Sequence, residues 1–448
     1  MKNGFILVAL IGLSVTSLGN VSNACARVHR DCLSGRTTKE IPVYAAGEEM
    51  TFEAKVLGFA GSDRAKMSIV WKRTGDDGRT ETGKAPVDRP FVYRTSLDRP
   101  GFVRLEGRLV DEQGKPVCAE CDGRRRAVIM DLGAGVDIGK IRPAVPAPGD
   151  FDAFWARHKA HLASVAWKDG VQLREIASPT AGVKLFEFSV PCYGGKPATG
   201  HLAVPADGAR KYPATARFFG YNHSWNYKSA ICPPQKVEAH CITMYVSAHG
   251  FEMGHDEAYY KAEREKVKSN GYGHGFDPEQ NADPEKTYYA GMTYRLMRAL
   301  EFLKSLPEWN GRDLTVTGGS QGGLQSIWAA ALDHDVTACN VSIPWNCDIG
   351  GTELGRNRGD WYVKWVPGLG YYDTCGMAPR IPKSCRLVVT MAGLGDYICP
   401  PTGVMAFYNG VTAPKEMRFV QNAQHGNWLE SRPQAFKLVG DAVMPVGK

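Results

Sequence analysis

Hydrophobic and polar residues follow two patterns along the chain, and the pattern changes near residue 140. Between Glu48 and Leu132, hydrophobic residues alternate with polar ones in short runs that turn-forming residues separate. The runs are Met50–Ala54, Met67–Trp71, Phe102–Glu106 and Ala127–Met130. Alternation with a period of two at this spacing predicts a small β-sandwich of short strands.

The chain after residue 150 combines strand-like and helical patterns. Three prolines within residues 141–149 predict a stiff, extended connection before this part. Asp150 is then placed to cap an amphipathic helix that begins at Phe151. From Val171 onward, hydrophobic strands and helices alternate. This order predicts a mostly parallel sheet that is covered by helices on both faces.

Six segments are expected to be strands of this sheet, because each is a short hydrophobic run. They are Phe186–Val190, Ala214–Phe219, Ile242–Val246, Leu314–Thr317, Arg386–Ala392 and Glu416–Val420. Asp283 and Pro284 are expected to begin a helix, in which hydrophobic residues from Met292 to Leu303 recur at helical spacing. The polar, glycine-rich stretch 250–281 is expected to be an irregular surface segment.

These patterns, together with a length of 448 residues and 43% hydrophobic content, predict large buried cores and more than one domain. The expected parts are a signal peptide at residues 1–26, an immunoglobulin-like β-sandwich domain at 27–140, a linker at 141–150 and an α/β domain at 151–448.

The first 26 residues have the layout of an export signal. Lys2 precedes an apolar run, Phe5–Val15, and small residues end the segment at Ala24-Cys25-Ala26. The run is too short to span a bilayer, and no later segment approaches the roughly 20 apolar residues that a membrane helix needs. We therefore expect a secreted or periplasmic protein without membrane insertion.

Charge and cysteine content refine this picture only slightly. The formal net charge of +7 is mild for this length, and the short basic run Arg124–Arg126 does not imply a nucleic-acid partner. Twelve cysteines in an exported chain predict some disulfides, with their pairing left open. Cys118 and Cys121 have metal-site spacing, but no second pair or nearby histidine completes a zinc site. A local disulfide is the expected use of this pair.

The strongest chemical signal is a serine in a glycine-rich turn. The sequence Gly318-Gly319-Ser320-Gln321-Gly322-Gly323 follows the expected strand Leu314–Thr317 and precedes a helical run that ends at Leu332. A G-x-S-x-G match is common by chance, but the strand before it and the helix after it favour a nucleophile elbow. The backbone amide of Gln321, at the start of that helix, is placed to stabilise an oxyanion.

A carboxylate and a histidine follow Ser320 in the order that α/β-hydrolases use. Asp396 comes just after the strand Arg386–Ala392, and His425 lies in the loop after the strand Glu416–Val420. Catalytic groups collect outside the carboxyl ends of parallel strands, so we expect Ser320, Asp396 and His425 to meet as a triad. Asp348, Asp373 and His249 are rival positions for the acid and the base.

Further motifs make the resemblance specific. The stretch Gly395-Asp396-Tyr397-Ile398-Cys399-Pro400-Pro401, with Tyr408-Asn409, Pro414-Lys415-Glu416 and the Ser320 turn, resembles the acetyl xylan esterase and cephalosporin C deacetylase family. The resemblance runs from about Pro146 to the C-terminus. It implies an α/β-hydrolase fold, Ser320 as nucleophile, Asp396 as acid, His425 as base, and a second oxyanion amide from Tyr221. It implies no metal or organic cofactor.

Two departures from that family's pattern stand out. His249-Gly250-Phe251 replaces the usual Arg-Gly-Gln motif, and Gly426 stands where a glutamate is expected after the histidine. Both motifs are mainly supportive, so the predicted triad is unaffected. Loop packing, substrate range and oligomeric assembly are left open, because the added N-terminal domain could block the family's usual oligomer.

The expected activity is removal of acetyl groups from xylan or xylo-oligosaccharides through an acetyl-serine intermediate. Trp225, Trp345 and Trp428 are candidates for stacking on sugar rings, as are Tyr227 and Trp361, with core packing as the ordinary alternative for each. Two other hypotheses remain. One is a peptidase of the prolyl oligopeptidase type, for which the N-terminal region is too short to form a propeller. The other is a non-catalytic glycan-binding protein.

Overall fold

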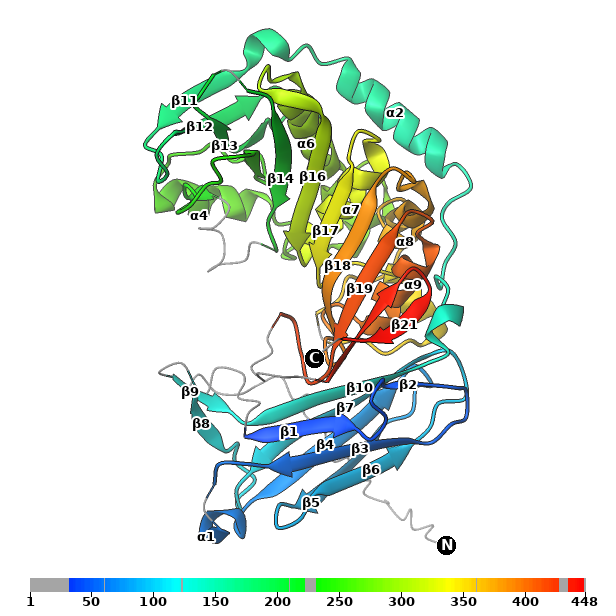
Figure 1. Ribbon diagram of the computed structural model, residues 1–448. Helices are drawn as coiled ribbons and strands as arrows, with labels where there is room; N and C mark the ends of the chain where they lie inside the picture. The colour runs from blue at the N-terminus through cyan, green and yellow to red at the C-terminus, as the bar shows by residue number, and fades with distance from the viewer. Residues whose placement is uncertain are drawn as a thin grey trace, which may run out of the picture.

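The structure is a computed structural model that describes residues 32–59, 61–121, 124–208, 210–221, 231–359, 361–426 and 434–446. The predicted signal peptide at residues 1–26 lies outside these residues. Figure 1 shows a smaller N-terminal part made of strands and a larger part in which helices accompany one long sheet.

Two sheets form the N-terminal part, which we call the two-sheet unit (residues 33–136). The first contains, in spatial order, β1 (Leu33–Thr37), β3 (Met50–Val56) and β6 (Phe91–Thr95). The second contains β2 (Val43–Tyr44), β10 (Ile129–Val136), β7 (Gly101–Val110), β4 (Ser68–Gly75) and β5 (Glu81–Pro86). A hairpin pairs β8 (Cys118–Cys121) with β9 (Arg124–Ala127).

One hydrophobic core joins the two sheets of this unit. Phe52 of β3 and Leu105 of β7 are fully buried in the same cluster. A β-carbon added to Gly35 in β1 would lie 2.7 Å from a methyl group of Leu132 in β10, so the sheets are in close contact. The four predicted strand runs therefore lie in a packed two-sheet arrangement, while the immunoglobulin-like assignment stays a prediction.

The larger part is built on a sheet of eleven strands among the described residues. Their spatial order is β11 (Gln172–Ile176), β12 (Val183–Val190), β13 (Ala198–Pro205), β15 (Ile242–Val246), β14 (Tyr212–Phe218), β16 (Trp309–Gly319), β17 (Ala338–Ser342), β18 (Arg386–Gly393), β19 (Lys415–Val420), β20 (Ala435–Val439) and β21 (Ala442–Pro445).

Strand direction in this sheet differs from the sequence prediction. Neighbouring strands from β15 to β19 are parallel, as expected for strands joined by helical crossovers. Antiparallel pairing instead joins β11, β12, β13 and β15 on one flank and β19, β20 and β21 on the other. The sheet is therefore mixed, and a parallel arrangement holds only for its centre.

Helices occur in both parts of the chain, the first of them between β3 and β4 of the two-sheet unit and the others in the larger part. They are α1 (Gly61–Arg64), α2 (Phe151–Ala163), α4 (Glu257–Lys266), α5 (Pro278–Ala282), α6 (Tyr288–Ser305), α7 (Gln321–Leu332), α8 (Thr374–Met377) and α9 (Pro401–Gly410), with 3-10 turns at Ile138–Lys140, Lys168–Gly170, Ile349–Leu354, Pro367–Tyr371 and Ala378–Arg380. Of the helices in the described parts of the chain, none is long and apolar enough to cross a membrane.

The start of α6 and the cap of α2 correct two predictions. Asp150 occupies the N-cap position of α2 but makes no capping hydrogen bond, because its carboxylate accepts from the Tyr371 hydroxyl at 2.5 Å. α6 begins at Tyr288 rather than after Asp283. Asp283 ends α5, and its carboxylate accepts from the amide of Glu285 within a turn.

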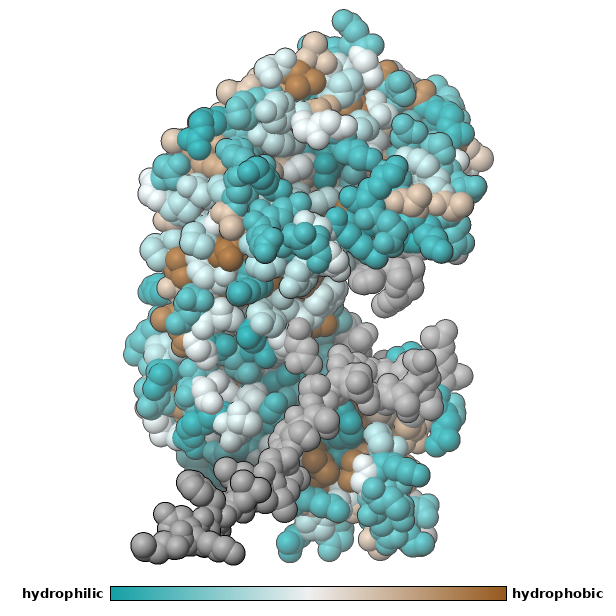
Figure 2. All heavy atoms as spheres, turned by 180° about the vertical axis from the view of Figure 1, so that it is seen from behind, coloured by the Kyte–Doolittle hydropathy of each residue, from teal (hydrophilic) through white to brown (hydrophobic). Residues whose placement is uncertain are grey.

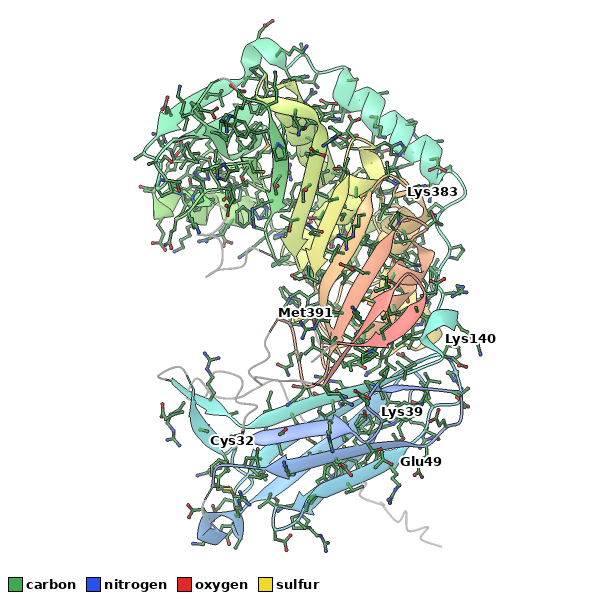
Figure 3. All side chains as sticks on the ribbon, in the orientation of Figure 1. Cys32, Lys39, Glu49, Lys140, Lys383 and Met391 are labelled. Atoms are coloured by element: carbon green, nitrogen blue, oxygen red, sulfur yellow. The ribbon has the colours of Figure 1, made fainter. Side chains whose placement is uncertain are left out.

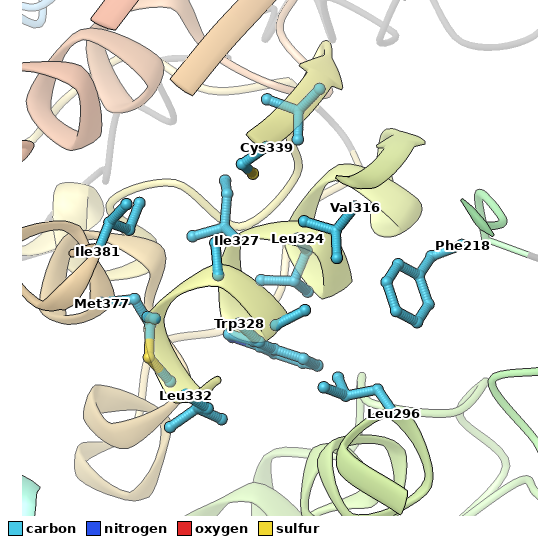
Figure 4. Packing of buried hydrophobic residues seen from close by; sticks show 14 of the residues in the cluster. Phe218, Leu296, Val316, Leu324, Ile327, Trp328, Leu332, Cys339, Met377 and Ile381 are labelled. Atoms are coloured by element: carbon cyan, nitrogen blue, oxygen red, sulfur yellow. The ribbon is translucent and has the colours of Figure 1, made fainter. Parts of the chain in front are cut away.

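The centre of the large core lies around α7. Figure 4 shows Leu324, Ile327 and Trp328 of this helix directed toward Val316 of β16 and the neighbouring elements. All twelve residues of α7 are buried, and Trp328 donates from its indole nitrogen to the carbonyl of Tyr372 at 2.8 Å. Burial on all sides fixes the helix that follows Ser320 relative to the sheet.

The outer surface has no comparable hydrophobic concentration on the face turned away from the viewer of Figure 1. Figure 2 shows that face as mainly hydrophilic, with hydrophobic residues scattered singly among the described atoms. Scattered exposed hydrophobic residues are ordinary for a folded chain.

Cysteines are mostly reduced in the described residues. Cys118 in β8 is disulfide-bonded, while the side chain of its expected partner Cys121 lies outside the described side chains. Eight others are free thiols: Cys192, Cys232, Cys241, Cys339, Cys347, Cys375, Cys385 and Cys399. The disulfide at Cys118 agrees with the prediction that some cysteines of this chain are paired.

Candidate functional site

Ser320 lies between β16 and α7 in a sharply bent backbone. Its φ of 57° and ψ of −121° are uncommon for a residue with a side chain. Glycines make this bend possible: a β-carbon on Gly318 would lie 2.5 Å from the backbone of Gly322, and one on Gly322 would lie 2.3 Å from the carbonyl oxygen of Phe218. The strand and helix therefore approach closely, and the serine hydroxyl points out of the turn.

His425 and Asp396 complete a hydrogen-bonded chain with Ser320. The Nε2 atom of His425 lies 3.0 Å from the serine Oγ, and its Nδ1 atom lies 3.0 Å from Oδ2 of Asp396. An ionised Asp396 can only accept, so Nδ1 carries the proton and Nε2 is free to accept from the hydroxyl. The three side chains come from the ends of β16, β18 and β19, as the sequence order predicts.

The Asp396 carboxylate is held firmly in this orientation. Its Oδ1 atom accepts from the amides of Ile398 and Cys399, both at 3.0 Å, which leaves Oδ2 for the imidazole. Asp396 is only 1% exposed, so the interaction with His425 takes place largely out of water. Fixed geometry and exclusion of solvent are what a residue that orients a histidine base requires.

The rival positions have other partners. Asp348 accepts from the Ala144 amide at 2.7 Å and pairs with Arg356. Asp373 accepts from the amides of Asp348 and Ile349, and burial next to Asp348 raises the pKa of its carboxyl group. The Nδ1 atom of His249 lies 2.7 Å from the Tyr288 hydroxyl. None of these interactions involves Ser320 or His425.

The two residues predicted to supply oxyanion amides lie next to the serine. Gln321 is the first residue of α7, so its amide is one of the free donors at a helix start. The backbone before Tyr221 also runs beside the nucleophile, because a β-carbon on Gly220 would lie 3.9 Å from the Ser320 β-carbon. Both segments are thus positioned at the reacting hydroxyl.

His274 links the side chains of these two residues, and sequence reasoning missed it. Its Nε2 atom lies 3.1 Å from the Gln321 side-chain amide. Its ring stacks on Tyr221 with centroids 4.0 Å apart, and the Tyr221 hydroxyl donates to its carbonyl at 3.2 Å. Burial raises the pKa of Tyr221, which keeps that hydroxyl protonated. Phe276, two positions on, is one sequence signal that the chain around His274 is buried.

The stretch 250–281 is therefore not an irregular surface segment. It contains α4 and α5, and His274, Asp277 and Asn281 within it are at most 4% exposed. The Asn281 amide donates to the Gly275 carbonyl at 2.8 Å, and the Asp277 carboxylate accepts from the Ser269 hydroxyl at 2.5 Å. Local hydrogen bonds explain how a polar, glycine-rich sequence can be buried.

The tryptophan candidates divide into two groups. Trp225 and Trp428, like Tyr227, lie outside the described residues. Trp345 is 2% exposed and packs against Phe276 and Trp361, with ring centroids 5.5 and 6.0 Å apart. Its backbone amide donates to the Ser320 carbonyl at 3.1 Å, so this aromatic cluster supports the turn that carries the serine.

A pocket lies beside the loop that follows Asp396, because Ile398 and Pro400 are part of its lining. It contains about 520 Å³ of empty space, open solvent included. Its lining includes Trp345, Ile398, Asn357 and Thr402. Ser320, Asp396 and His425 are not among the lining residues, so the pocket adjoins the triad through Trp345 and the loop after Asp396.

A third ligand-type side chain lies near the acid and the base. Atoms of Asp396, Cys399 and His425 that could bind a metal ion lie within 4.8 Å of one another. Asp396 and His425 are already hydrogen-bonded to each other, and burial raises the pKa of the Cys399 thiol well above its usual value. A protonated thiol is a poor metal ligand, so the arrangement suits proton transfer better than metal binding.

Comparison with known proteins decides the family. The family model for acetyl xylan esterase (AXE1) matches residues 129–352 and 360–438, which is more than half of the chain. The chain belongs to the acetyl xylan esterase family. Membership implies a carboxylic ester hydrolase. The family match confirms the resemblance seen in the motifs around Ser320 and Asp396.

Individual relatives agree with this assignment. The acetyl esterase Axe7A of Xylanibacter ruminicola is 29% identical over 387 residues, which cover 79% of this chain and 77% of that protein. Among solved structures, the acetyl xylan esterase from Paenibacillus sp. R4 has a TM-score of 0.51 at 23% identity, covering 65% of this chain and 94% of the other. Acetyl xylan esterase 1 from Thermoanaerobacterium sp. JW/SL YS485 has a TM-score of 0.52 at 21% identity, with coverage of 65% and 93%. The two structures establish an α/β-hydrolase fold.

The structure shows how the residues at both departures from the family's pattern, His249 and Gly426, fit their surroundings. His249 packs edge-on to His274, with centroids 4.6 Å apart, and burial lowers the pKa of its imidazole well below the usual value. Gly426 has a φ of 78°, a conformation that a glutamate adopts only with strain. The glycine after His425 therefore fits the backbone found in this esterase.

Proposed function

We propose that this chain is a serine esterase that removes acetyl groups from acetylated carbohydrate, with xylan or xylo-oligosaccharides as substrate. The observation that carries the proposal is the continuous chain from the Ser320 hydroxyl through His425 to the buried Asp396, with 3.0 Å at each link. The names of the relatives, acetyl esterase and acetyl xylan esterase, support the acyl group and the polymer.

The first half-reaction transfers the acetyl group to Ser320. His425 takes the hydroxyl proton as Oγ forms a bond to the ester carbonyl carbon. Asp396 stabilises the imidazolium and holds it in position. The bond to the sugar oxygen then breaks, and the sugar leaves with the proton that His425 returns.

The second half-reaction releases acetate. Water gives a proton to His425 and attacks the acetyl-serine carbonyl, and the serine oxygen leaves with that proton. In both steps negative charge develops on the carbonyl oxygen. Backbone amides of Gln321 and Tyr221 are proposed to stabilise that charge, and the start of α7 adds its positive dipole end.

Location and domain roles follow from the sequence. We propose that residues 1–26 direct export and that the mature esterase acts in the periplasm or outside the cell. We further propose a division into a β-sandwich domain at 27–140, a linker at 141–150 and the hydrolase domain at 151–448. Acetylated plant polymers are encountered outside the cytoplasm, which suits this placement.

The experiment that tests the function measures acetate release from acetylated xylo-oligosaccharides by the purified protein, with Ser320→Ala as the control. The substitution is expected to lower turnover by about six orders of magnitude, as in other serine-hydrolase triads. Full activity of the variant would disprove the role of Ser320. Cleavage of a chromogenic peptide in place of acetyl esters would favour a peptidase, and oligosaccharide binding without turnover would favour a glycan-binding protein.

A further inference from the structure

The two-sheet unit contacts the chain at residues before and after His425. The side chain of Gln421 accepts from the Gly133 amide at 2.7 Å and donates to the Gly133 carbonyl at 2.8 Å. The side chain of Asn422 accepts from the Asp131 amide at 2.9 Å. Gly133 and Asp131 belong to β10, so a strand of the N-terminal unit holds the loop three residues before the histidine.

The residue that directly precedes β20, Gln434, contacts β1 and the turn after it. Gln434 accepts from the Thr37 amide at 3.0 Å. Its side-chain nitrogen donates to the carbonyls of Lys39 at 2.6 Å and Glu40 at 2.9 Å. In Figure 3, Lys39 lies near the junction between the two parts, and Met391 marks the end of β18 that faces the two-sheet unit.

The loop that carries Asp396 packs against the two-sheet unit so closely that main-chain atoms of the two segments are neighbours. A β-carbon on Gly395 would lie 2.3 Å from the β-carbon of Asp131, and one on Gly133 would lie 2.4 Å from the carbonyl oxygen of Leu394. Arg104 of β7 places its guanidinium 4.6 Å from the ring centre of Tyr397, directly after Asp396. Contacts this close leave the Asp396 loop little freedom to shift.

Asp76 of the two-sheet unit forms hydrogen bonds with residues that line the pocket. Its carboxylate accepts from the amides of Phe102 at 2.7 Å and Asn357 at 2.8 Å, and from the Thr402 hydroxyl. Asn357 and Thr402 both line the pocket beside the site. Asp76 is 6% exposed, and a buried carboxylate that collects three donors fixes the segments that supply them.

We propose that the two-sheet unit is a positioning element of the esterase site, which holds His425 and Asp396 in register with Ser320 and shapes the pocket through Asp76. The inference rests on the proposed function. The loops after β18 and β19 bond to each other, with the Gly395 amide donating to the Ala423 carbonyl at 3.0 Å, and the two-sheet unit adds its contacts to both of them. Gln421, Gln434 and Asp76 are positioning residues because they act through the loops and not on the substrate.

The test replaces the two glutamines that hold the His425 stretch. The double variant Gln421→Ala/Gln434→Ala is expected to lower kcat for p-nitrophenyl acetate by roughly 10- to 100-fold, since a misplacement of about 1 Å costs on the order of 100-fold. KM is expected to stay within about twofold, because the pocket is left intact. Gln113→Ala is the matched control, since Gln113 is exposed in the same unit and its side chain takes no part in these contacts.

A second variant keeps the proposal testable if the double glutamine variant fails to fold. Asp76→Asn keeps the size of the side chain but offers one carbonyl oxygen, so at least one of its three donors loses its acceptor. Because Asn357 and Thr402 line the pocket, this variant is expected to raise KM severalfold, in contrast to the glutamine variant. Thermal unfolding by circular dichroism shows whether each protein is folded at the assay temperature.

Hydrogen–deuterium exchange supplies a readout that does not depend on turnover. Exchange in residues 421–426 is expected to rise in the double glutamine variant and to stay unchanged in Gln113→Ala. A folded double variant with wild-type kcat and wild-type exchange would overturn the inference. Wild-type protein that hydrolyses no acetyl ester would instead overturn the proposed function, and increased exchange in the variant would still support the positioning contacts.

Discussion

The turn that holds Ser320 and the loops that hold its partners obtain their rigidity from different sources. The serine turn is enclosed by its own strand and helix, with Gly318 and Gly322 allowing close approach and α7 buried on all sides. The loops of Asp396 and His425 bond to each other and to β10 of the two-sheet unit, and Gln434 just before β20 bonds to β1. One arrangement is local in sequence, and the other joins residues almost 400 positions apart. The chemistry requires both to be aligned at once.

The sharpest test of the loop side is Asp396→Asn. The amide can no longer hold the histidine in the useful tautomer, and kcat is expected to fall about 10,000-fold, as in comparable triads. Asp373→Asn is the comparison, because Asp373 is a buried aspartate with other partners and its loss should leave turnover within a few fold. Steady-state kinetics with p-nitrophenyl acetate measures both. If Asp373→Asn is the inactive variant, the acid has been assigned to the wrong residue.

On the side of the turn, Gly318→Ala adds a β-carbon 2.5 Å from the Gly322 backbone. Neither backbone can move freely, so we expect a loss of about 1–3 kcal/mol of unfolding free energy. We also expect a drop in kcat of roughly 100-fold, because Ser320 is displaced. Gly149→Ala is the control, since no atom lies within 4 Å of its added carbon. Denaturant unfolding and kinetics that leave Gly318→Ala like the control would show that the turn tolerates the extra carbon.

A smaller effect on kcat is expected for substitution of His274, which belongs neither to the serine turn nor to the loops of Asp396 and His425. His274→Ala removes the ring that stacks on Tyr221 and contacts Gln321, so both proposed oxyanion donors become less fixed. We expect kcat to fall on the order of 10-fold, less than the roughly 100-fold or more seen when an oxyanion donor is removed outright. KM should change little. His334→Ala, an exposed histidine elsewhere, is the control, and equal kcat in the two variants would exclude a positioning role for His274.

The smallest expected effect is on the free energy of unfolding and not on kcat. Burial, aided by Arg174, lowers the pKa of His201 in β13 to about 4, against an ordinary value near 6.5. The unfolded chain therefore binds this proton first, and unfolding free energy is lost as pH falls from about 6.5 to 4, by at most about 3 kcal/mol. His201→Leu should flatten that slope in urea unfolding without changing kcat at pH 7. An unchanged slope would show that another group causes the acid sensitivity.

Features that depend on neighbours in the chain could be predicted from the sequence, whereas contacts between distant residues were harder to predict. The strand Leu314–Thr317, the turn at Ser320 and the helix to Leu332 could be read directly, because each depends on neighbours in the chain. Asp396 and His425 could be placed because strand order puts their loops at one edge. His274 could not be foreseen, since its contacts with Tyr221 and Gln321 come from a polar stretch whose burial depends on distant partners.

The direction of the flanking strands and the first residues of helices were harder to predict from the sequence, because they also depend on the surrounding fold. Hydrophobic runs such as Phe186–Val190 identify a strand but not its direction, so the antiparallel flanks were not predicted. Asp283 has the sequence of a helix cap, yet it stabilises the turn before α6 through Glu285. A capping residue and a turn residue use the same side chain and the same kind of hydrogen bond, and only the surrounding fold distinguishes them.

Strand β10 has a practical consequence for anyone who shortens this protein. The family match begins at residue 129, the first residue of β10, yet this strand pairs with β2 on one side and β7 on the other. A truncation at the family boundary would strip both neighbours and leave a hydrophobic strand with unsatisfied main-chain groups along each edge. Such an edge recruits strands from other molecules. Expression trials designed from the family boundary alone should therefore give aggregates, whereas chains that begin before β1 should stay in solution.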